Sequence, residues 1–311
     1  MPFLSVIIPL YNKELYIQNT LTSVLNQTFT DFEIIIVNDG STDNSLEIVS
    51  RFKDERIIII NQQNSGASST RNKAIQHAQT DYIAFLDADD FWFPNHLEEL
   101  VKLILAFPNC GMYCSRYQTI IAKNHTINNS FSYSFPDSFS GIIPDFFRAS
   151  LVNRVATSSS IIVPKHIIIE NDGFNTAISS GQDLELWTKI GIKHKVAINN
   201  TISAIYHFET PNSLAKTAIT KKTLMDFSQF LTAEKENKSL KEFLDIHRLE
   251  YALQYRIAGD IENSKNFLKN ITSNIPLKTK ILLSIPSFVL RLLLKTKHLL
   301  KKYGVDFTVY H

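Results

Sequence analysis

Residues 81–92 read DYIAFLDADDFW, an apolar run that ends in three aspartates within four positions. A short, nearly continuous apolar run is typical of a strand that is covered on both faces of a parallel sheet. Asp87, Asp89 and Asp90 then fall where the chain leaves the sheet. Carboxylates so close together repel one another unless a positive group lies among them. The stretch therefore predicts a buried strand followed by a site that holds a cation.

Three further runs of the same type precede this strand, and segments with helical spacing of apolar residues separate them. The runs are LSVIIPL (4–10), EIIIVND (33–39) and RIIIIN (56–61). Alternating strands and helices predict βαβ units, hence an α/β fold whose central, mostly parallel sheet is flanked by helices. Ligands bind such sheets at the carboxyl ends of the strands, which is where Asp39 and the aspartates of 87–90 lie.

The later part of the chain is less regular. Residues 108–150 lack a clear period and are expected to be irregular, and beyond Asn212 the pattern becomes helical. We therefore expect an α/β domain over 1–212 and a helical C-terminal region over 213–311. Further expected elements are strands at 157–164 and 201–208, a helix at 180–191, and two helices around a Gly-Asp turn within 248–271.

The composition is that of a soluble globular protein, with 44% hydrophobic and 20% charged residues. Two cysteines, Cys110 and Cys114, supply neither a disulfide framework nor a four-ligand zinc site, so we expect reduced thiols in a cytoplasmic protein. No secretory signal is recognisable. The longest apolar stretch, Ile281–Leu294, is shorter than the roughly 20 residues of a membrane span, so no crossing is expected.

The residue types that follow the strand at 82–87 point to a hard metal ion. Carboxylate oxygens suit Mg²⁺ or Mn²⁺, which keep few protein ligands and are completed by phosphate oxygens and water. A metal on two phosphates can neutralise a diphosphate leaving group. The glycine-rich phosphate loops G-x-x-x-x-G-K-[ST] and G-x-G-x-x-G are absent from the sequence. The alternative is that the aspartates only form a turn or cap a helix, a role that suits Asp90.

Three blocks of the chain together resemble the family 2 glycosyltransferases with the GT-A fold. They are SVIIPLYNKELYIQNTLTSVLNQTFTDFEIIIVNDGSTDNS (5–45), NSGASSTRNKAIQHAQTDYIAFLDADDFW (64–92) and GFNTAISSGQDLELW (173–187). The resemblance runs in order over about residues 3–210. It implies a nucleotide-sugar donor, a divalent metal and inversion at the anomeric carbon.

The resemblance also implies which residues bind the nucleotide: Pro9, Leu10, Tyr11, Asp39, Arg71 and Asp87. Among them Asp39 corresponds to the carboxylate that accepts a hydrogen bond from the base. An acceptor-only group selects a ring edge with an N–H donor, as in uracil, thymine or guanine. Arg71 corresponds to a basic residue near the nucleotide, with a helix-surface ion pair as the alternative.

The metal is implied to lie at Asp89, with Asp87 nearer the ribose, and His207 completes the metal or diphosphate site in many relatives. A histidine after a strand can equally be structural, so that role stays open. The general base that removes the acceptor proton corresponds to Asp183. The family's Glu-Asp pair reads Gln182-Asp183 here, which leaves the role of the missing Glu in question. Gln182 and Trp187 are expected near acceptor or donor, and Glu185 is the fallback base.

The C-terminal end is basic, with nine Lys/Arg and no Asp/Glu between residues 263 and 305. Over 287–302 the cationic side chains follow helical spacing, opposite a leucine-rich face. Such a helix can lie on an anionic membrane surface, or pack against the α/β domain with its lysines in solvent. Binding of nucleic acid is not expected, because no aromatic platform accompanies the charge.

The leading hypothesis is therefore a metal-dependent inverting glycosyltransferase. It would use a nucleotide sugar, UDP-linked by preference, and act on a saccharide or lipid-linked acceptor in surface polysaccharide synthesis. We expect it in the cytoplasm, with peripheral attachment to the inner face of the plasma membrane. The alternatives are a non-catalytic nucleotide-binding module, and a sugar-nucleotide nucleotidyltransferase, whose glycine-rich basic loop is missing after the first strand.

Overall fold

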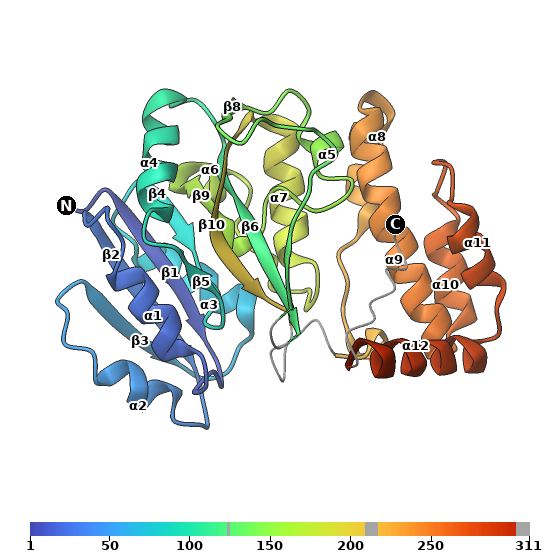
Figure 1. Cartoon of the computed structure of the whole chain (residues 1–311), viewed down its shortest axis with the longest axis horizontal. Coiled ribbons are helices and arrows are strands. Elements are labelled where there is room, and N and C mark those ends of the chain that lie inside the picture. Colours follow the sequence, from blue (N-terminus) through green and yellow to red (C-terminus); the bar gives the residue numbers. More distant parts are fainter. Residues whose placement is uncertain (123–124, 209–216, 303–311) are drawn as a thin grey trace. The chain divides into compact units, whose positions relative to one another are not determined.

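A computed structural model describes residues 1–122, 125–208 and 217–302 (Figure 1). The chain divides into two compact units, one of Met1–Ala215 with Thr223–Asp226, the other of Lys216–Lys222 with Phe227–His311. Each unit is considered by itself. The expected boundary between residues 212 and 213 lies outside the described residues.

The first unit is built on parallel strands in the spatial order β3-β2-β1-β4. These strands are β1 (Leu4–Leu10), β2 (Phe32–Asp39), β3 (Ile57–Gln62) and β4 (Tyr82–Phe85). The connecting helices are α1 (Ile17–Leu25), α2 (Ser45–Ser50) and α3 (Ala67–His77). The parallel βαβ arrangement predicted from the apolar runs is confirmed. Asp87 and Asp89 lie in the turn just beyond β4, which ends two residues earlier than predicted.

The sheet continues from β4 through β9, β6 and β10 to β5. The elements are β5 (Phe91–Trp92), β6 (Met112–Ala122), β9 (Ile161–Pro164) and β10 (Val196–His207). Because β9 is antiparallel to both β4 and β6, and β6 is parallel to β10, these last two run in the direction of β1–β4. The sheet of the described residues is thus mixed, with mostly parallel strands.

The expectation that residues 108–150 are irregular was wrong. This stretch contains β6, the edge strands β7 (His125–Asn128) and β8 (Ser140–Ile142), and the short helix α5 (Phe146–Ala149). The sequence of β6 does not read as a buried strand because it has polar residues even at buried positions: Ser115 is fully buried. Its parallel partner β10 begins more than seventy residues later, so no local pattern reveals the pairing.

The other helices and strands predicted for the first unit are present, but their bounds differ from the predicted ones by a few residues. The expected strand over 157–164 opens with a 3₁₀ turn, η1 (Ser158–Ser160), before β9. The expected helix over 180–191 is α7 (Gln182–Lys193), and α4 (His96–Ala106) and α6 (Lys165–Glu170) complete the set.

Helices cover both faces of the sheet. On one face, alternate apolar residues of β1 and β2 pack with residues of α1, α2 and α4 in one cluster. On the other, Phe85 of β4 contacts Phe174 and Trp187, with ring centroids 5.4 and 5.7 Å away. Because both faces of the sheet are covered, the polar residues at the carboxyl ends of the strands are the ones that can contact a ligand.

The second unit is helical, as predicted. Its helices are α8 (Leu231–Glu236), α9 (Lys238–Ala258), α10 (Ile261–Leu268), α11 (Leu277–Ser284) and α12 (Ser287–Lys302). The expected Gly-Asp turn separates α9 from α10, with Gly259 at φ 95° and Asp260 capping α10 through the Asn263 amide. In its interior, Arg248 is fully buried and pairs with Glu234 and Asp245.

Both cysteines are buried and free. Among the described residues, no helix is both long and apolar enough to span a membrane.

Candidate functional site

A cavity of about 420 Å³ opens at the carboxyl ends of β1, β2 and β4. Residues from the ends of these strands, from the start of α3, from residues 176–182 and from the end of β10 line it. The predicted nucleotide-binding residues that line it are Pro9, Leu10, Tyr11, Asp39, Arg71 and Asp87. Asp89, Gln182 and His207 line it as well, so most of the predicted site residues share one cavity.

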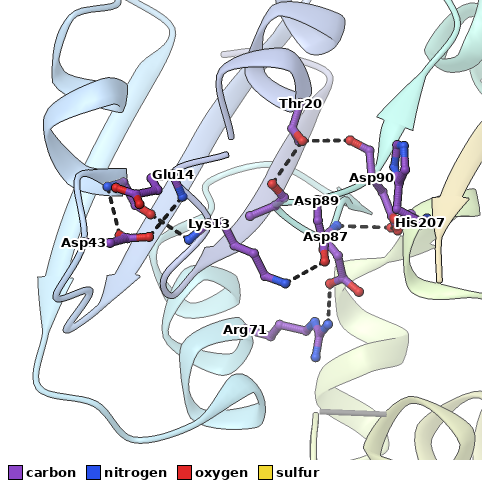
Figure 2. Close-up of polar contacts among 12 residues, drawn as sticks. Lys13, Glu14, Thr20, Asp43, Arg71, Asp87, Asp89, Asp90 and His207 are labelled. Atoms are coloured by element: carbon purple, nitrogen blue, oxygen red, sulfur yellow. Dashed lines mark hydrogen bonds and ion pairs between the residues drawn. The ribbon is translucent and has the colours of Figure 1, made fainter. Parts of the chain in front are cut away.

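Two cationic side chains hold the aspartates that follow β4 (Figure 2). The ammonium of Lys13 lies 2.6 Å from Asp89 Oδ2, and Arg71 Nη2 lies 2.5 Å from Asp87 Oδ1. Both pairs are largely shielded from solvent, which strengthens the attraction between the charges. Lys13 and Arg71 therefore supply the positive charge that offsets the repulsion among the aspartates.

Asp90, unlike its neighbours, points away from the cavity into the protein and is 2% exposed. Its carboxylate accepts the hydroxyl of Ser159 and the backbone N–H of His207, the latter at 2.8 Å. Burial, and then the charges of Asp89 and Asp87, raise the pKa of Asp90 well above its usual value. Asp90 therefore anchors the turn to β10, in keeping with the structural role considered for it from the sequence.

Two hydroxyl groups fix the backbone of the same turn. Thr20 Oγ1 lies 3.1 Å from the carbonyl of Ala88 and 2.8 Å from that of Asp90. Ser159 Oγ accepts the backbone N–H of Asp87 at 3.1 Å. Sequence reasoning missed both, because neither α1 nor η1 carries a motif for contacts 68 and 72 residues away. Lys13 was also missed, although its place in PLYNKE, just after β1, could have indicated it.

Asp39 ends β2 and is 3% exposed, yet lines the cavity. Its Oδ1 accepts Gln62 Nε2 at 2.7 Å and the Ser65 amide at 2.8 Å, and its Oδ2 accepts the Gly66 amide at 3.0 Å. The amide bonds come from the start of α3, where the positive end of the helix dipole favours a carboxylate. These bonds fix the carboxylate and leave acceptor capacity on Oδ2.

His207 ends β10, and its ring lies 6.3 Å from that of Tyr16. Burial lowers the pKa of His207, which favours the neutral imidazole that metal ions bind. Its backbone bond to Asp90 brings it to the aspartate turn from 117 residues away.

Asp183 is the second residue of α7, which begins at Gln182 after Gly181, whose φ of 86° turns the chain into the helix. Its Oδ2 lies 3.0 Å from Arg154 Nη1. Burial acts to raise the pKa of Asp183, but the positive charges of Arg154 and Arg71 outweigh it, and the pKa lies below the usual value. Asp183 is thus held ionised, as a base must be. It is not among the residues that line the cavity, whereas the preceding Gln182 is.

Two expectations on α7 concern side chains that the structure buries. Trp187 is 2% exposed, packs against Phe85 and Phe174 and is not among the residues that line the cavity, so its expected contact with acceptor or donor stays a prediction. Glu185 is buried and pairs with Lys189 at 2.7 Å, so it is unsuited to act as the fallback base. The two side chains point to different sides of α7: Trp187 packs on Phe85 of the sheet, whereas Glu185 contacts Asn175 and Lys189.

The donor set suits a hard cation that shares its coordination with a ligand. Within the described part of the chain, no group of three or more His, Cys, Asp or Glu side chains is arranged to hold a metal ion. Asp89 and Asp87 nevertheless present carboxylates to the cavity, beside His207. Two or three protein ligands completed by phosphate oxygens are usual for Mg²⁺ and Mn²⁺.

Comparison with known proteins agrees with this geometry. The family model for Glycosyl transferase family 2 matches residues 5–173. The chain is 32% identical over 218 residues to the putative teichuronic acid biosynthesis glycosyltransferase TuaG of Bacillus subtilis, covering 65% of this chain and 82% of TuaG. It is 29% identical over 226 residues to a hyaluronan synthase of Pasteurella multocida, covering 71% of this chain. The chain spans only 22% of that synthase.

Solved structures show the same fold. The structure of S. aureus TarS 1–349 in complex with UDP-GlcNAc matches with a TM-score of 0.59 at 18% identity, covering 85% of this chain and 90% of that chain. The full TarS structure matches with a TM-score of 0.61 over 90% of this chain. The central sheet is therefore that of the GT-A fold. With the family match over more than half of its length, this chain belongs to glycosyl transferase family 2.

Proposed function

We propose that the protein transfers a sugar, with inversion, from a UDP-sugar to a saccharide or lipid-linked acceptor in surface polysaccharide synthesis, and that it needs Mn²⁺ or Mg²⁺. One observation carries the proposal. Asp87 and Asp89, after β4, line the same cavity as Asp39, at the end of β2, with cationic groups of the protein beside them; β2 and β4 are the two strands that flank β1. This arrangement provides a base-reading carboxylate and a charged diphosphate site in one cleft.

The nucleoside is placed at the β1 and β2 end of the cavity. Pro9, Leu10 and Tyr11 provide the wall, and the Tyr11 ring, half exposed, offers a surface for stacking. Asp39 accepts an N–H of the base. The solved complexes of TarS with UDP and UDP-GlcNAc, on the same fold, support a uridine nucleotide.

The diphosphate is placed at the aspartate turn. Asp89, with Asp87 and His207, would hold the divalent ion, and when bound the ion neutralises charge on the diphosphate leaving group. Lys13 and Arg71, which pair with these aspartates in the ligand-free protein, become available to the phosphate oxygens. The protein therefore keeps two positive side chains ready at the place where negative charge develops.

Asp183 removes the proton of the acceptor hydroxyl as its oxygen attacks the anomeric carbon. Arg154 keeps Asp183 ionised and fixes one of its oxygens, while the other remains to accept a proton. An attack on the face opposite the leaving diphosphate gives inversion. Gln182, which lines the cavity beside the base, can bond a hydroxyl through its amide.

We further propose that the protein lies in the cytoplasm and attaches peripherally to an anionic membrane surface, and exposed side chains of the second unit support the attachment. Its last two helices expose large apolar side chains among the lysines: Leu277 (74%), Ile281 (51%), Phe288 (68%) and Leu292 (63%). Apolar insertion and cationic attraction to lipid head groups act together in such helices.

Flotation with liposomes tests the attachment. The full chain is expected to float with anionic and not with neutral vesicles. Phe288→Ser with Leu292→Ser is expected to abolish flotation, whereas Leu105→Ser, at an equally exposed leucine of α4, leaves it unchanged. Equal flotation of the double variant would contradict this role of α12.

Slow hydrolysis of the donor tests the proposed activity. With Mn²⁺ and a panel of nucleotide sugars, we expect release of nucleoside diphosphate, fastest from UDP-sugars. Asp89→Ala is expected to reduce it at least a hundredfold. Asp81→Ala, an exposed aspartate at the opposite end of β4, is the matched control and should keep full activity.

One feature favours a second candidate, a nucleotide-binding module without turnover. Gln182 occupies the place of the family's glutamate and lines the cavity. In that case UDP binds with metal, no donor is hydrolysed, and Gln182→Glu restores turnover. Hydrolysis by the natural sequence excludes this candidate.

A further inference from the structure

We propose that the hydroxyl of Ser68 is a base-reading group, which donates a hydrogen bond to a carbonyl oxygen of the bound nucleobase beside the N–H that Asp39 accepts. The inference rests on the proposed function and adds a specificity-determining residue to it. Its starting point is a buried polar atom. Ser68 lines the cavity and is 4% exposed, and its Oγ has no hydrogen-bond partner among the described residues.

An unpartnered buried hydroxyl is unfavourable in the free protein, because it has lost its bonds to water without replacing them. Groups of this kind are uncommon in native structures and call for an explanation. A ligand atom in the cavity would supply the missing bond. Arg71 Nε, one turn further along α3, is likewise buried with no hydrogen-bond partner in the part of the chain that the structure describes, so the cavity face of this helix lacks more than one bond there.

The position of Ser68 ties it to Asp39. The Ser65 and Gly66 amides bind the carboxylate of Asp39, and Ser68 follows on the first turn of α3. Gly66 has a φ of 86°, and a Cβ added there meets nothing within 4 Å, so the space over this turn is open. A planar group that contacts Asp39 thus has the hydroxyl of Ser68 within about one helical turn.

The two groups together read a definite pattern. Asp39 only accepts hydrogen bonds, whereas a serine hydroxyl can also donate one. An N–H beside a carbonyl, as on uracil, thymine and guanine, satisfies both. Held in the same pose, cytosine turns its ring nitrogen N3, an acceptor, toward the acceptor-only carboxylate of Asp39, which is then left unpaired. Leaving a buried group unpaired is the strongest way to reject an analogue.

The decisive variant is Ser68→Ala, with Ser69→Ala as the matched control. Ser69 is the next residue of α3 and does not line the cavity. Because Ser68 Oγ has no partner to lose among the described residues, Ser68→Ala should not lower the urea midpoint of the ligand-free protein. Calorimetry with UDP and Mn²⁺ should show affinity about tenfold weaker for Ser68→Ala and unchanged for Ser69→Ala.

Nucleotide analogues locate the contact. With 2′-deoxy-UDP the tenfold effect of Ser68→Ala should persist, whereas with CDP, already a weak ligand, it should disappear. An effect that vanishes with 2′-deoxy-UDP would assign Ser68 to the ribose and overturn the base contact. Equal UDP affinity of Ser68→Ala and the natural sequence, or loss of stability without ligand, would overturn it too. If the natural sequence bound no UDP, the proposed function itself would fail, which is a different result.

Discussion

At the scale of single residues, the site depends on ion pairs whose members come from different elements. Lys13 follows β1, Arg71 lies in α3, and both reach the turn after β4. The aspartates themselves are readable from the sequence, because three carboxylates behind an apolar run have few structural uses. The pairing of each aspartate with Lys13 or Arg71 is not readable, since a lysine or arginine at a strand end or on a helix is most often solvated.

Lys13→Met should strengthen the binding of Mn²⁺ to the nucleotide-free protein by roughly five- to tenfold. The ammonium of Lys13 occupies Asp89 Oδ2, and its removal takes away a positive charge 2.6 Å from the proposed metal ligand. Electron paramagnetic resonance of free Mn²⁺ measures the affinity. Lys53→Met, an exposed lysine after α2, serves as the control, and weaker Mn²⁺ binding by Lys13→Met would contradict the competition.

His96 should make the protein less stable below neutral pH. It is fully buried against Trp92, with Nδ1 2.8 Å from Ser203 Oγ, and burial lowers its pKa from 6.5 to about 3. Between these values the unfolded chain binds a proton that the folded chain does not. The contribution of His96 to the free energy of unfolding is therefore complete above pH 6.5. It falls as the pH decreases, by about 2 kcal/mol from pH 7 to pH 5.

Urea unfolding at several pH values measures this loss. His96→Asn, although less stable throughout, should show a pH dependence flatter by that amount. His166→Asn, at a partly exposed histidine of α6, should keep the full dependence. If the free energy of unfolding changed with pH by the same amount in His96→Asn and in the natural sequence, His96 would be ruled out as the titrating group.

At the scale of elements, η1 and β10 hold the aspartate turn in place. Ser159 accepts the Asp87 amide and donates to Asp90, which in turn binds the His207 amide. The alternation of strands and helices predicts the first half of the sheet, because each βαβ unit carries its own local signal. The second half was mispredicted over 108–150, because β6 is defined by partners distant in sequence.

Ser159→Ala should lower the free energy of unfolding by about 1–3 kcal/mol, since it leaves the buried Asp90 with one donor fewer. It should also weaken Mn²⁺ binding, because the turn that presents Asp87 and Asp89 loses an anchor. Chemical unfolding and Mn²⁺ titration measure the two effects. Ser158→Ala, at a buried neighbour in η1, is the control for both measurements. If Ser159→Ala matched Ser158→Ala in stability and in Mn²⁺ affinity, the Ser159 hydroxyl would not be needed to hold the turn.

At the scale of the whole molecule, the chain has two units with separate interiors. The second is held in part by Arg248, which is buried with Glu234, Asp245 and the ring of Phe227, 4.8 Å away. Both units of the chain contribute to the proposed function in different ways: the first carries the nucleotide cavity, and the second carries the basic, apolar helices.

Arg248→Met should destabilise the second unit by about 3–5 kcal/mol, because it leaves two buried carboxylates without their main partner. The cavity lies wholly within the first unit, so UDP affinity at a temperature below unfolding should be unchanged. Calorimetric unfolding and UDP titration give the two results. Arg291→Met, at an exposed arginine of α12, should alter neither. A large loss of UDP affinity in Arg248→Met would show that the units depend on each other.

The sequence by itself determined the α/β class, the parallel strands β1–β4, the helical C-terminal region and the aspartates at the strand ends of the cavity. It could do so because strand and helix periods are local, and because the carboxyl ends of parallel strands must meet at one edge. Only the tertiary structure decided which charges are paired, that Trp187 and Glu185 are buried, and that the Ser68 hydroxyl has no partner within the described ranges. Each of these depends on side chains brought together from distant elements, and hydrogen bonds and ion pairs act only at contact distance.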